Sequence, residues 1–296
     1  MHDIFSGYHP LVNITYFAFV MLLGMYFMNP ICLGISMITS LFYLAYLKGV
    51  KGLKKNLMYM LPMVLITAIL NPVFNHEGAT ILFYLKDGNP MTLESIVYGI
   101  ATATMLVSAL GWFACFNEVI TSDKLMYLFG RILPSLSLML SMTLRMAPRF
   151  QQHIKKVSDV QKCIGRDVTQ GNVIQKMKHG LKIISIMVMW ALENAIDTAD
   201  SMKSRGYGLR GRTAFSIYRL DKRDRRVMMA IIGSALFILY GVVQGAIKFQ
   251  YYPKIKIADM TTMSFMTYIV YGLLCLMPLI MNIWEAIKWK HLQSKI

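Results

Sequence analysis

Charged residues are scarce in this sequence, and acidic residues are the scarcest of them. Only 16% of the 296 residues are charged, with 15 Asp and Glu against 31 Lys and Arg, while 56% are hydrophobic. A soluble domain typically carries about 25% charged residues, so the composition excludes one ordinary water-soluble core. It predicts an integral membrane protein instead.

Cysteine and histidine are also few, and their spacing matches no common site. The cysteines are Cys32, Cys115, Cys163 and Cys275. They show no paired spacing, so neither a disulfide framework nor a zinc site is expected. His76 and Glu77 lack the second histidine of a zinc protease motif, and neither a P-loop nor a dinucleotide fingerprint occurs. We therefore expect no metal, no cofactor and no catalytic nucleotide site.

Six apolar stretches approach the length of about 20 residues that a helix needs to cross about 30 Å of hydrocarbon. They are residues 11–28, 31–47, 56–73, 92–116, 227–247 and 264–284. The start of the chain has no basic region and no cleavage site, so the first stretch is expected to remain in the protein. The predicted fold is all-α, with about six membrane helices.

The excess of basic residues is concentrated in one part of the chain. Residues 144–226 hold 18 of the 31 Lys and Arg but only 7 of the 15 Asp and Glu. Cytoplasmic loops are enriched in Lys and Arg, so this region and the lysine-rich loop 48–55 are expected inside the cell. Both termini then lie in the cytoplasm. The predicted regions are N-terminal membrane helices (1–143), a cytoplasmic region (144–226) and C-terminal membrane helices (227–296).

The central region contains a first amphipathic helix. The preceding stretch, 125–143, is apolar but interrupted by Arg131 and Pro134. This pattern favours a helix near the membrane interface, or one packed against other protein, over an uninterrupted membrane span. In "RFQQHIKKVSDVQKCIG", apolar residues recur every three or four positions. This helix is predicted to begin near Pro148 and to end by Gly165 or soon after.

A second amphipathic helix follows the turn "TQGN" at 169–172. It is predicted to run from Val173 or Leu181 to Arg205, with apolar residues along one face. Gly206 is a natural stop, because glycine readily takes the left-handed conformation that ends many helices. Both helices thus end in a cluster of Gly and Arg. Their apolar faces need a cover, which could be lipid, other helices of the chain or a partner.

Arg205 is predicted to project from the end of the second helix. Small neighbours would let this tip enter a cleft on another protein, where the guanidinium binds carboxylates or carbonyls bidentately. Two alternatives stay open. Arg205 could cap the carbonyls of its own helix, or the cluster "RGYGLRGR" could cradle a phosphate, although no strand precedes it.

These motifs resemble those of a known family. The region from about Arg145 to Asp221 resembles the transmembrane coupling subunit, or T component, of energy-coupling factor (ECF) transporters, a family that includes the Q-type subunits of cobalt and nickel uptake systems. The matching residues are Arg145 and Pro148, "VQKCIG" at 160–165 and "ADSMKSRGYG" at 199–208.

The first of the two signatures departs from the family pattern. Cys163 and Ile164 stand where the family has Ala and Arg, and the nearest arginine is Arg166, after Gly165. Either Arg166 takes the role from a shifted position, or this helix docks through apolar contacts.

The resemblance implies two long cytoplasmic coupling helices whose tips bind two ABC-type ATPase subunits. The implied ATPase-coupling residues are Ser204, Arg205, Gly206, Cys163, Ile164, Gly165 and Arg166. It also implies a separate membrane partner, the S component, which binds the vitamin or metal ion. The implied contacts with that partner are Ile154, Val157, Ile184, Val188 and Leu192. Each of these could equally be an ordinary packing residue.

Other classes of function compete with this one. Glu193, Asp197 and Asp200 share a helix face and could hold a metal ion in a membrane-embedded lipid-modifying enzyme. A channel or secondary transporter would need ionisable residues inside the spans, which have almost none. No stacking platform or known module accompanies the basic residues, so nucleic acid is not expected as a partner. Most of these residues are expected to attract the anionic lipid bilayer.

Overall fold

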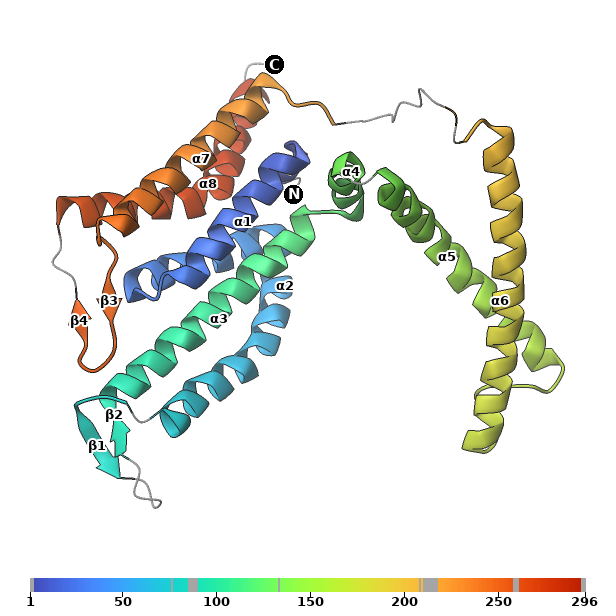
Figure 1. Ribbon diagram of the computed structural model, residues 1–296, viewed down its shortest axis with the longest axis horizontal. Helices are drawn as coiled ribbons and strands as arrows, with labels where there is room; N and C mark the ends of the chain where they lie inside the picture. The colour runs from blue at the N-terminus through green and yellow to red at the C-terminus, as the bar shows by residue number, and fades with distance from the viewer. Residues whose placement is uncertain are drawn as a thin grey trace. The chain divides into compact units, whose positions relative to one another are not determined.

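The computed structural model describes residues 3–75, 77–84, 90–132, 134–207, 209, 218–257 and 261–293. Within these residues the chain forms eight α-helices (Figure 1) and two small antiparallel sheets. The sheets pair β1 (Ile81–Tyr84) with β2 (Pro90–Thr92), and β3 (Phe249–Gln250) with β4 (Lys256–Ile257). Helices dominate, which confirms the predicted all-α class.

The chain divides into two compact units. Unit 1 comprises Met1–Leu125 and Tyr218–Ile296, and unit 2 comprises Met126–Ile217. The long helices of unit 1 are α1 (Pro10–Tyr26), α2 (Pro30–Phe74), α3 (Leu93–Val119), α7 (Lys222–Val243) and α8 (Thr262–Gln293). The three regions predicted from the charge pattern stay a prediction.

Local chemistry explains where α1 and α2 begin. Each has proline at its first position, where a helix needs no backbone N–H. The side chain of the preceding residue accepts a hydrogen bond from the first turn: His9 Nδ1 accepts from Leu11 N at 3.2 Å, and Asn29 Oδ1 accepts from Ile31 N at 3.0 Å. These caps satisfy backbone donors that have no partner within the helix.

A kink divides α2 into two helical segments. Gly49 has φ of 69° and ψ of 174°, which is not helical, and φ in this range is readily adopted only by glycine. The segments on either side of Gly49 correspond to the predicted stretches 31–47 and 56–73. The second segment also accommodates Pro62 and Pro72.

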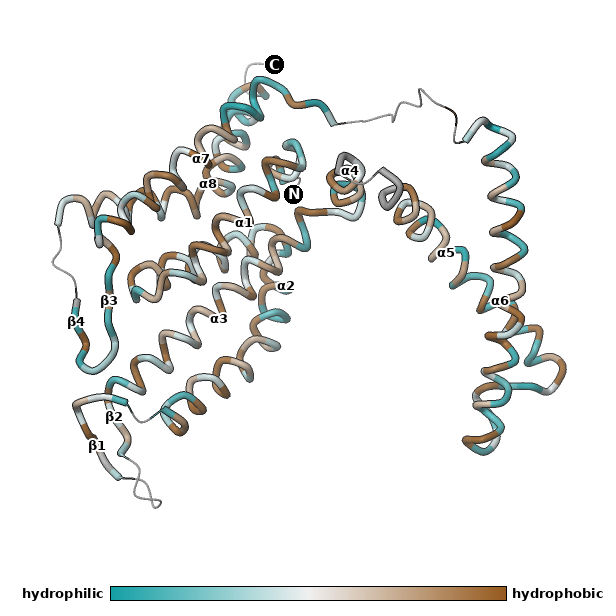
Figure 2. The backbone as a smooth tube through the Cα atoms, viewed as in Figure 1, coloured by the Kyte–Doolittle hydropathy of each residue, from teal (hydrophilic) through white to brown (hydrophobic). Residues whose placement is uncertain are grey.

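Four helices in the described part of the chain are long and apolar enough to cross a membrane, namely α2, α3, α7 and α8. The tube in Figure 2 is brown and white over most of their length. The apolar helix α1 is shorter, with 17 residues. Helices therefore cover most of each of the six predicted stretches, and the chain is a multi-pass membrane protein. The number of full crossings stays a prediction.

An aromatic cluster lies at the centre of unit 1. The ring of Trp112 in α3 meets those of Tyr16 and Phe17 in α1 edge to face, at centroid distances of 6.1 and 6.4 Å. Next to this cluster α2 and α3 approach so closely that a Cβ atom on Gly111 would lie 2.7 Å from Ser40 Oγ. Small residues at such contacts allow the dense packing by which membrane helices associate.

Unit 2 is built on a hairpin of two long helices, α5 (Pro134–Cys163) and α6 (Val173–Ser204), which follow α4 (Ser122–Ile132). The two helices run antiparallel. The ring of Phe150 lies 5.3 Å from that of Trp190, and Met146 Sδ lies 3.9 Å from Asn194 Nδ2. The end of α5 and the end of α6 therefore lie at opposite ends of the hairpin.

The start of α5 differs from the prediction. The helix begins at Pro134 and Pro148 lies inside it, so the predicted start near Pro148 was wrong. An internal proline removes one backbone hydrogen bond, but the helix continues through it because its apolar side packs on α6. The start of α6 at Val173 confirms the earlier of the two predicted starts, and Asn172 with Gln175 forms a capping box there.

Candidate functional site

The helix α6 ends in a glycine-based turn at the second signature. Gly206 has φ of 78°. The backbone N–H groups of Gly206 and Tyr207 donate to the carbonyl oxygens of Lys203 and Met202, both at 3.0 Å. This pair of bonds is the Schellman arrangement, in which one left-handed residue closes a helix. The predicted stop at Gly206 is confirmed, and Gly208, the last residue of the signature, lies outside the described residues.

The helix α5 ends in the same turn at the first signature. Gly165 has φ of 76°. The N–H of Gly165 donates to the carbonyl oxygen of Lys162 at 3.0 Å, and the N–H of Arg166 donates to that of Gln161 at 2.9 Å. The predicted end of the helix near Gly165 is confirmed. The two signatures therefore form the same type of backbone turn although their sequences differ.

The arginine occupies a different position in each turn. Arg205 directly precedes the left-handed glycine, whereas Arg166 directly follows it. Ile164 takes the place before the glycine in the first turn, where it is 62% exposed. Both arginines are exposed, as are Ser204 and Cys163 at the last positions of the two helices. A partner that met both turns in the same orientation would meet a guanidinium at one and an aliphatic side chain at the other.

Arg205 lines a cleft of about 290 Å³ between α5 and α6, which Arg145 and Asp197 also line. Among the described residues the guanidinium of Arg205 makes no hydrogen bond or ion pair. The described residues therefore give no support to the alternative that its side chain caps its own helix. Two arginines against one carboxylate leave the cleft positively charged, which favours an anionic group. The alternative phosphate cradle at 205–212 lies partly outside the described residues.

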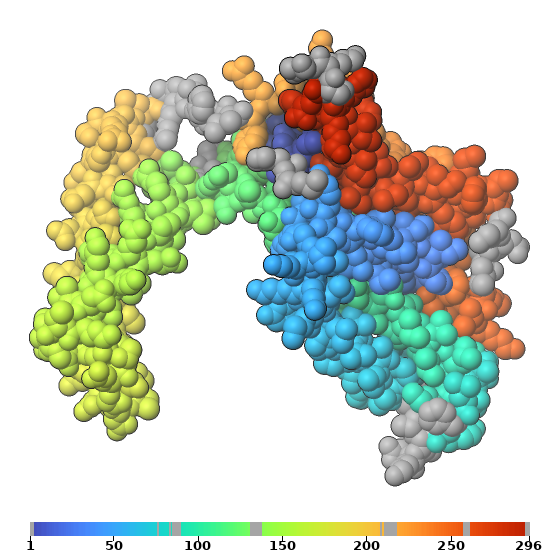
Figure 3. All heavy atoms as spheres, turned by 180° about the vertical axis from the view of Figure 1, so that it is seen from behind, coloured from blue at the N-terminus to red at the C-terminus, as the bar shows by residue number. Residues whose placement is uncertain are grey.

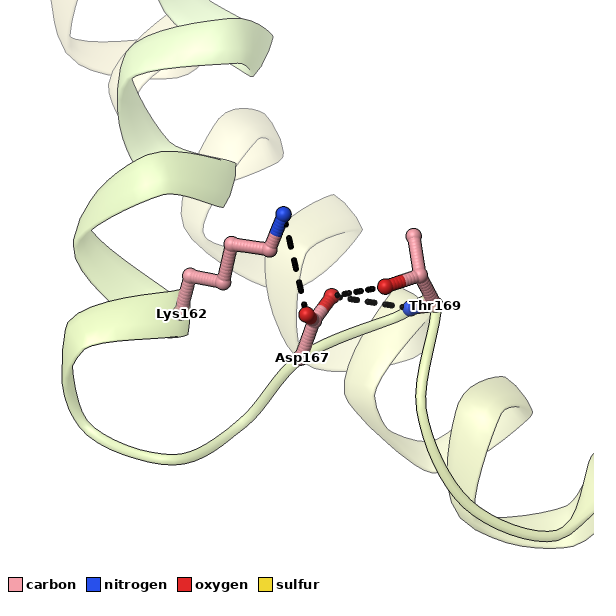
Figure 4. A network of polar contacts seen from close by, with 3 residues as sticks. All are labelled: Lys162, Asp167 and Thr169. Carbon is pink, nitrogen blue, oxygen red and sulfur yellow. Dashed lines mark hydrogen bonds and ion pairs between the residues drawn. The ribbon is translucent and has the colours of Figure 1, made fainter.

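A polar network holds the turn after α5 (Figure 4). Asp167 Oδ1 accepts hydrogen bonds from the backbone N and the Oγ1 of Thr169, at 2.9 and 2.8 Å, and Lys162 Nζ lies 3.6 Å from Asp167 Oδ2. These contacts lower the pKa of Asp167, the backbone N–H of Thr169 most of all. This network was not predicted. The Asp-x-Thr spacing, typical of local side-chain turns, was the signal for it.

An apolar groove of about 430 Å³ runs along the hairpin of unit 2. Four of the five predicted partner contacts line it: Ile154, Ile184, Val188 and Leu192. Val157 is half-buried and does not belong to the groove that the described residues form. Leu192 is 63% exposed, so the apolar face is open to a partner or to lipid.

The floor of this groove was not predicted. Ile183 and Met187 are buried beneath it. Beside it the imidazole of His153 stacks on the indole of Trp190, with ring centroids 4.1 Å apart and planes 17° apart. These residues share the helical spacing of their exposed neighbours, so the sequence pattern did not separate the floor from the rim.

The three acidic residues of the enzyme alternative do not form a metal site. Glu193, Asp197 and Asp200 are exposed on α6, and Asp200 Oδ1 lies 3.9 Å from Lys203 Nζ. No group of three His, Cys, Asp or Glu side chains in the described part of the chain is arranged to hold a metal ion. The geometry therefore gives the enzyme alternative no support.

Comparison with known proteins identifies several relatives. The chain is 31% identical to the energy-coupling factor transporter transmembrane protein EcfT of Streptococcus thermophilus over 106 residues, which is 36% of the chain and 40% of that protein. It is 31% identical to EcfT of Lactococcus lactis subsp. cremoris over 105 residues, 35% of the chain and 40% of that protein. It is 26% identical to EcfT 1 of Listeria monocytogenes over 211 residues, 66% of the chain and 74% of that protein.

The similarity to the first two relatives thus spans 40% of their length, and no family model matches the chain. All three relatives have the name that the helix-end signatures predict. The resemblance is therefore confirmed: the chain is similar to energy-coupling factor transporter transmembrane proteins.

Proposed function

We propose that the chain is the membrane-embedded coupling subunit of an ECF-type importer, which passes ATP-driven motion to a substrate-binding partner. The observation that carries this proposal is the pair of identical glycine turns at the ends of α5 and α6, each with an exposed arginine. Two equal turns at opposite ends of one hairpin suit two copies, or two homologues, of a docking partner.

The partners at the two ends are two cytoplasmic ABC-type ATPases. A helix of 32 residues such as α6 is about 48 Å long at about 1.5 Å per residue, so one small groove cannot receive both ends. Arg205 binds carboxylates or carbonyls in the groove of one ATPase. Ile164 and Arg166 contact the other. Closure of the ATPase pair on ATP then moves the two helices relative to each other.

The apolar groove of unit 2 receives the S component. Its lining is almost entirely apolar and its rim residues are exposed, which suits a membrane-embedded helix better than a water-soluble protein. Motion of α5 against α6 changes the shape of this groove, and so acts on whatever is bound in it. The S component chooses the substrate, a vitamin or a metal ion.

The basic residues set the orientation in this proposal. The turn after α5 and the turn after α6 both lie in the region that holds 18 of the 31 Lys and Arg, which belongs in the cytoplasm. Both chain termini lie on the same side. The ATPase-binding ends are then accessible to soluble subunits.

Affinity purification from native membranes tests the proposal. The tagged chain should copurify with ATPase subunits and with a second integral membrane protein. The purified chain alone should turn over neither ATP nor lipid. Lipid turnover by the isolated chain, or purification without any ATPase from membranes that transport actively, would contradict the proposed role.

A further inference from the structure

A pocket of about 340 Å³ in unit 1 has no part in the proposed coupling. It lies between α2, from Lys48 just before the kink into the second segment, and the C-terminal half of α3, and α2 lies on the face viewed in Figure 3. The two helices run antiparallel here, since Asn71 Nδ2 in α2 donates to Thr102 Oγ1 in α3 at 3.0 Å, whereas Lys48, earlier in α2, lies 3.3 Å from Glu118, later in α3. The start of this segment of α2 therefore lies beside the end of α3.

The lining of the pocket changes from polar to apolar along the helices. Lys48, Asn56 and Asn117 line one end, and Tyr59, Met63 and Phe113 line the part further along. The polar end coincides with the point where the lysine-rich stretch 48–55 gives way to an apolar helix. In a membrane protein this change marks the level of the lipid headgroups.

The polar end is also basic. Lys48 Nζ lies 3.3 Å from the carboxylate of Glu118, and Lys51, Lys54 and Lys55 are exposed in the turns that follow. This stretch of α2 therefore carries four lysines, of which Lys48 is paired with a carboxylate. Lysines at this level attract anionic lipid headgroups.

We propose that this pocket binds one anionic phospholipid. The headgroup phosphate lies at Lys48 and Asn56, and an acyl chain lies along Tyr59, Met63 and Phe113. The amide of Asn56 is available for this contact, because its Nδ2 has no hydrogen-bond partner among the described residues and unpaired buried donors are rare in proteins. The proposal requires only that α2 spans a membrane, so it is independent of the proposed coupling function.

Native mass spectrometry of the full chain in detergent tests this site. The chain is titrated with dioleoyl phosphatidylglycerol or with dioleoyl phosphatidylcholine. We expect one molecule of phosphatidylglycerol to bind about fivefold or more tightly than phosphatidylcholine, because surface lysines favour the anionic headgroup. Inorganic phosphate at millimolar concentration should leave the lipid bound. Equal binding of the two lipids, or displacement by phosphate, would overturn the proposal.

Two variants separate lipid binding from structural damage, since both break the ion pair between Lys48 and Glu118. Lys48→Ala should reduce the preference for phosphatidylglycerol toward equality, whereas Glu118→Gln should increase it. Lys256→Ala, which removes an exposed charge from β4, should leave it unchanged. An equal loss in Lys48→Ala and Glu118→Gln, or in Lys48→Ala and Lys256→Ala, would refute a specific site.

Discussion

The ammonium group of Lys124 lies 2.6 Å from the backbone carbonyl oxygen of Ser6. It also donates to Ser6 Oγ at 3.1 Å and to the carbonyl oxygen of Val119 at 2.8 Å, and the residue is only 5% exposed. This lysine, in the first turn of α4, ties the N-terminal segment to the end of α3. Burial lowers the pKa of Lys124, because the charged form loses its hydration.

Lys124→Met should destabilise unit 1. The substitution leaves the carbonyl oxygens of Ser6 and Val119 without their donor, and each unpaired buried group costs about 1–3 kcal/mol. We expect the thermal midpoint of the purified protein to fall by several degrees. Lys222→Met, at the exposed start of α7, should leave it unchanged. An unaltered midpoint in Lys124→Met would show that these bonds add nothing to stability.

Arg205→Glu should release the ATPases from the complex. It reverses the charge at the exposed end of α6, where a hydrogen bond to a charged partner contributes about 1.5–3 kcal/mol, equivalent to about tenfold or more in affinity. Copurified ATPase, measured by quantitative mass spectrometry, should fall accordingly. Lys182→Glu makes the same charge change in the N-terminal third of α6 and should retain the ATPases. If Arg205→Glu also retains them, the end of α6 is not the docking point.

Ile164→Arg should strengthen the docking of the first helix end. It places an arginine directly before Gly165, as Arg205 stands before Gly206. ATPase dissociation should slow by about tenfold. Cys163→Arg adds the same charge one position earlier and should have a smaller effect. Equal effects of the two variants would mean that charge, and not position in the turn, decides docking.

Asp167→Asn should loosen the turn after α5. The pKa of Asp167 lies below its ordinary value of 3.8, so the carboxylate stabilises the folded turn fully above pH 3.8, and this contribution is lost as the pH falls through the lowered pKa. At neutral pH, hydrogen exchange of residues 163–172 should be faster in Asp167→Asn than in the unchanged chain. Asp159→Asn within α5 is the control. Equal exchange rates in the two variants would show that the network in Figure 4 does not stabilise the turn.

Val188→Asp should remove the S component and spare the ATPases. A carboxylate in the apolar groove has no partner there, and burying it against a membrane-embedded protein is costly. Ile196→Asp replaces another exposed aliphatic residue of α6, outside the groove-lining set, so that variant should keep both partners. Copurification measures the outcome, and loss of the S component from both variants would contradict a specific groove.

The two helix-end turns show which features of the fold can be predicted from the sequence. Gly165 and Gly206 were predicted as stops, because a glycine after an amphipathic stretch is a local signal and the turn that it forms involves only neighbouring residues. The start of α5 was predicted wrongly because that prediction also used only a local signal. A proline inside a helix is locally unfavourable, and packing against α6, which lies further along the chain, outweighs that cost.

The sequence by itself determined which segments are apolar enough for a membrane, which two helices are amphipathic and where both end. Each of these properties depends on residues within a few positions of one another. Only the tertiary structure decided that Ile183 and Met187 form the floor of a groove, that Arg145 joins Arg205 at one cleft, and that Lys124 is buried against Ser6. Those relationships join residues that are distant in the chain, and the packing of whole helices brings them together.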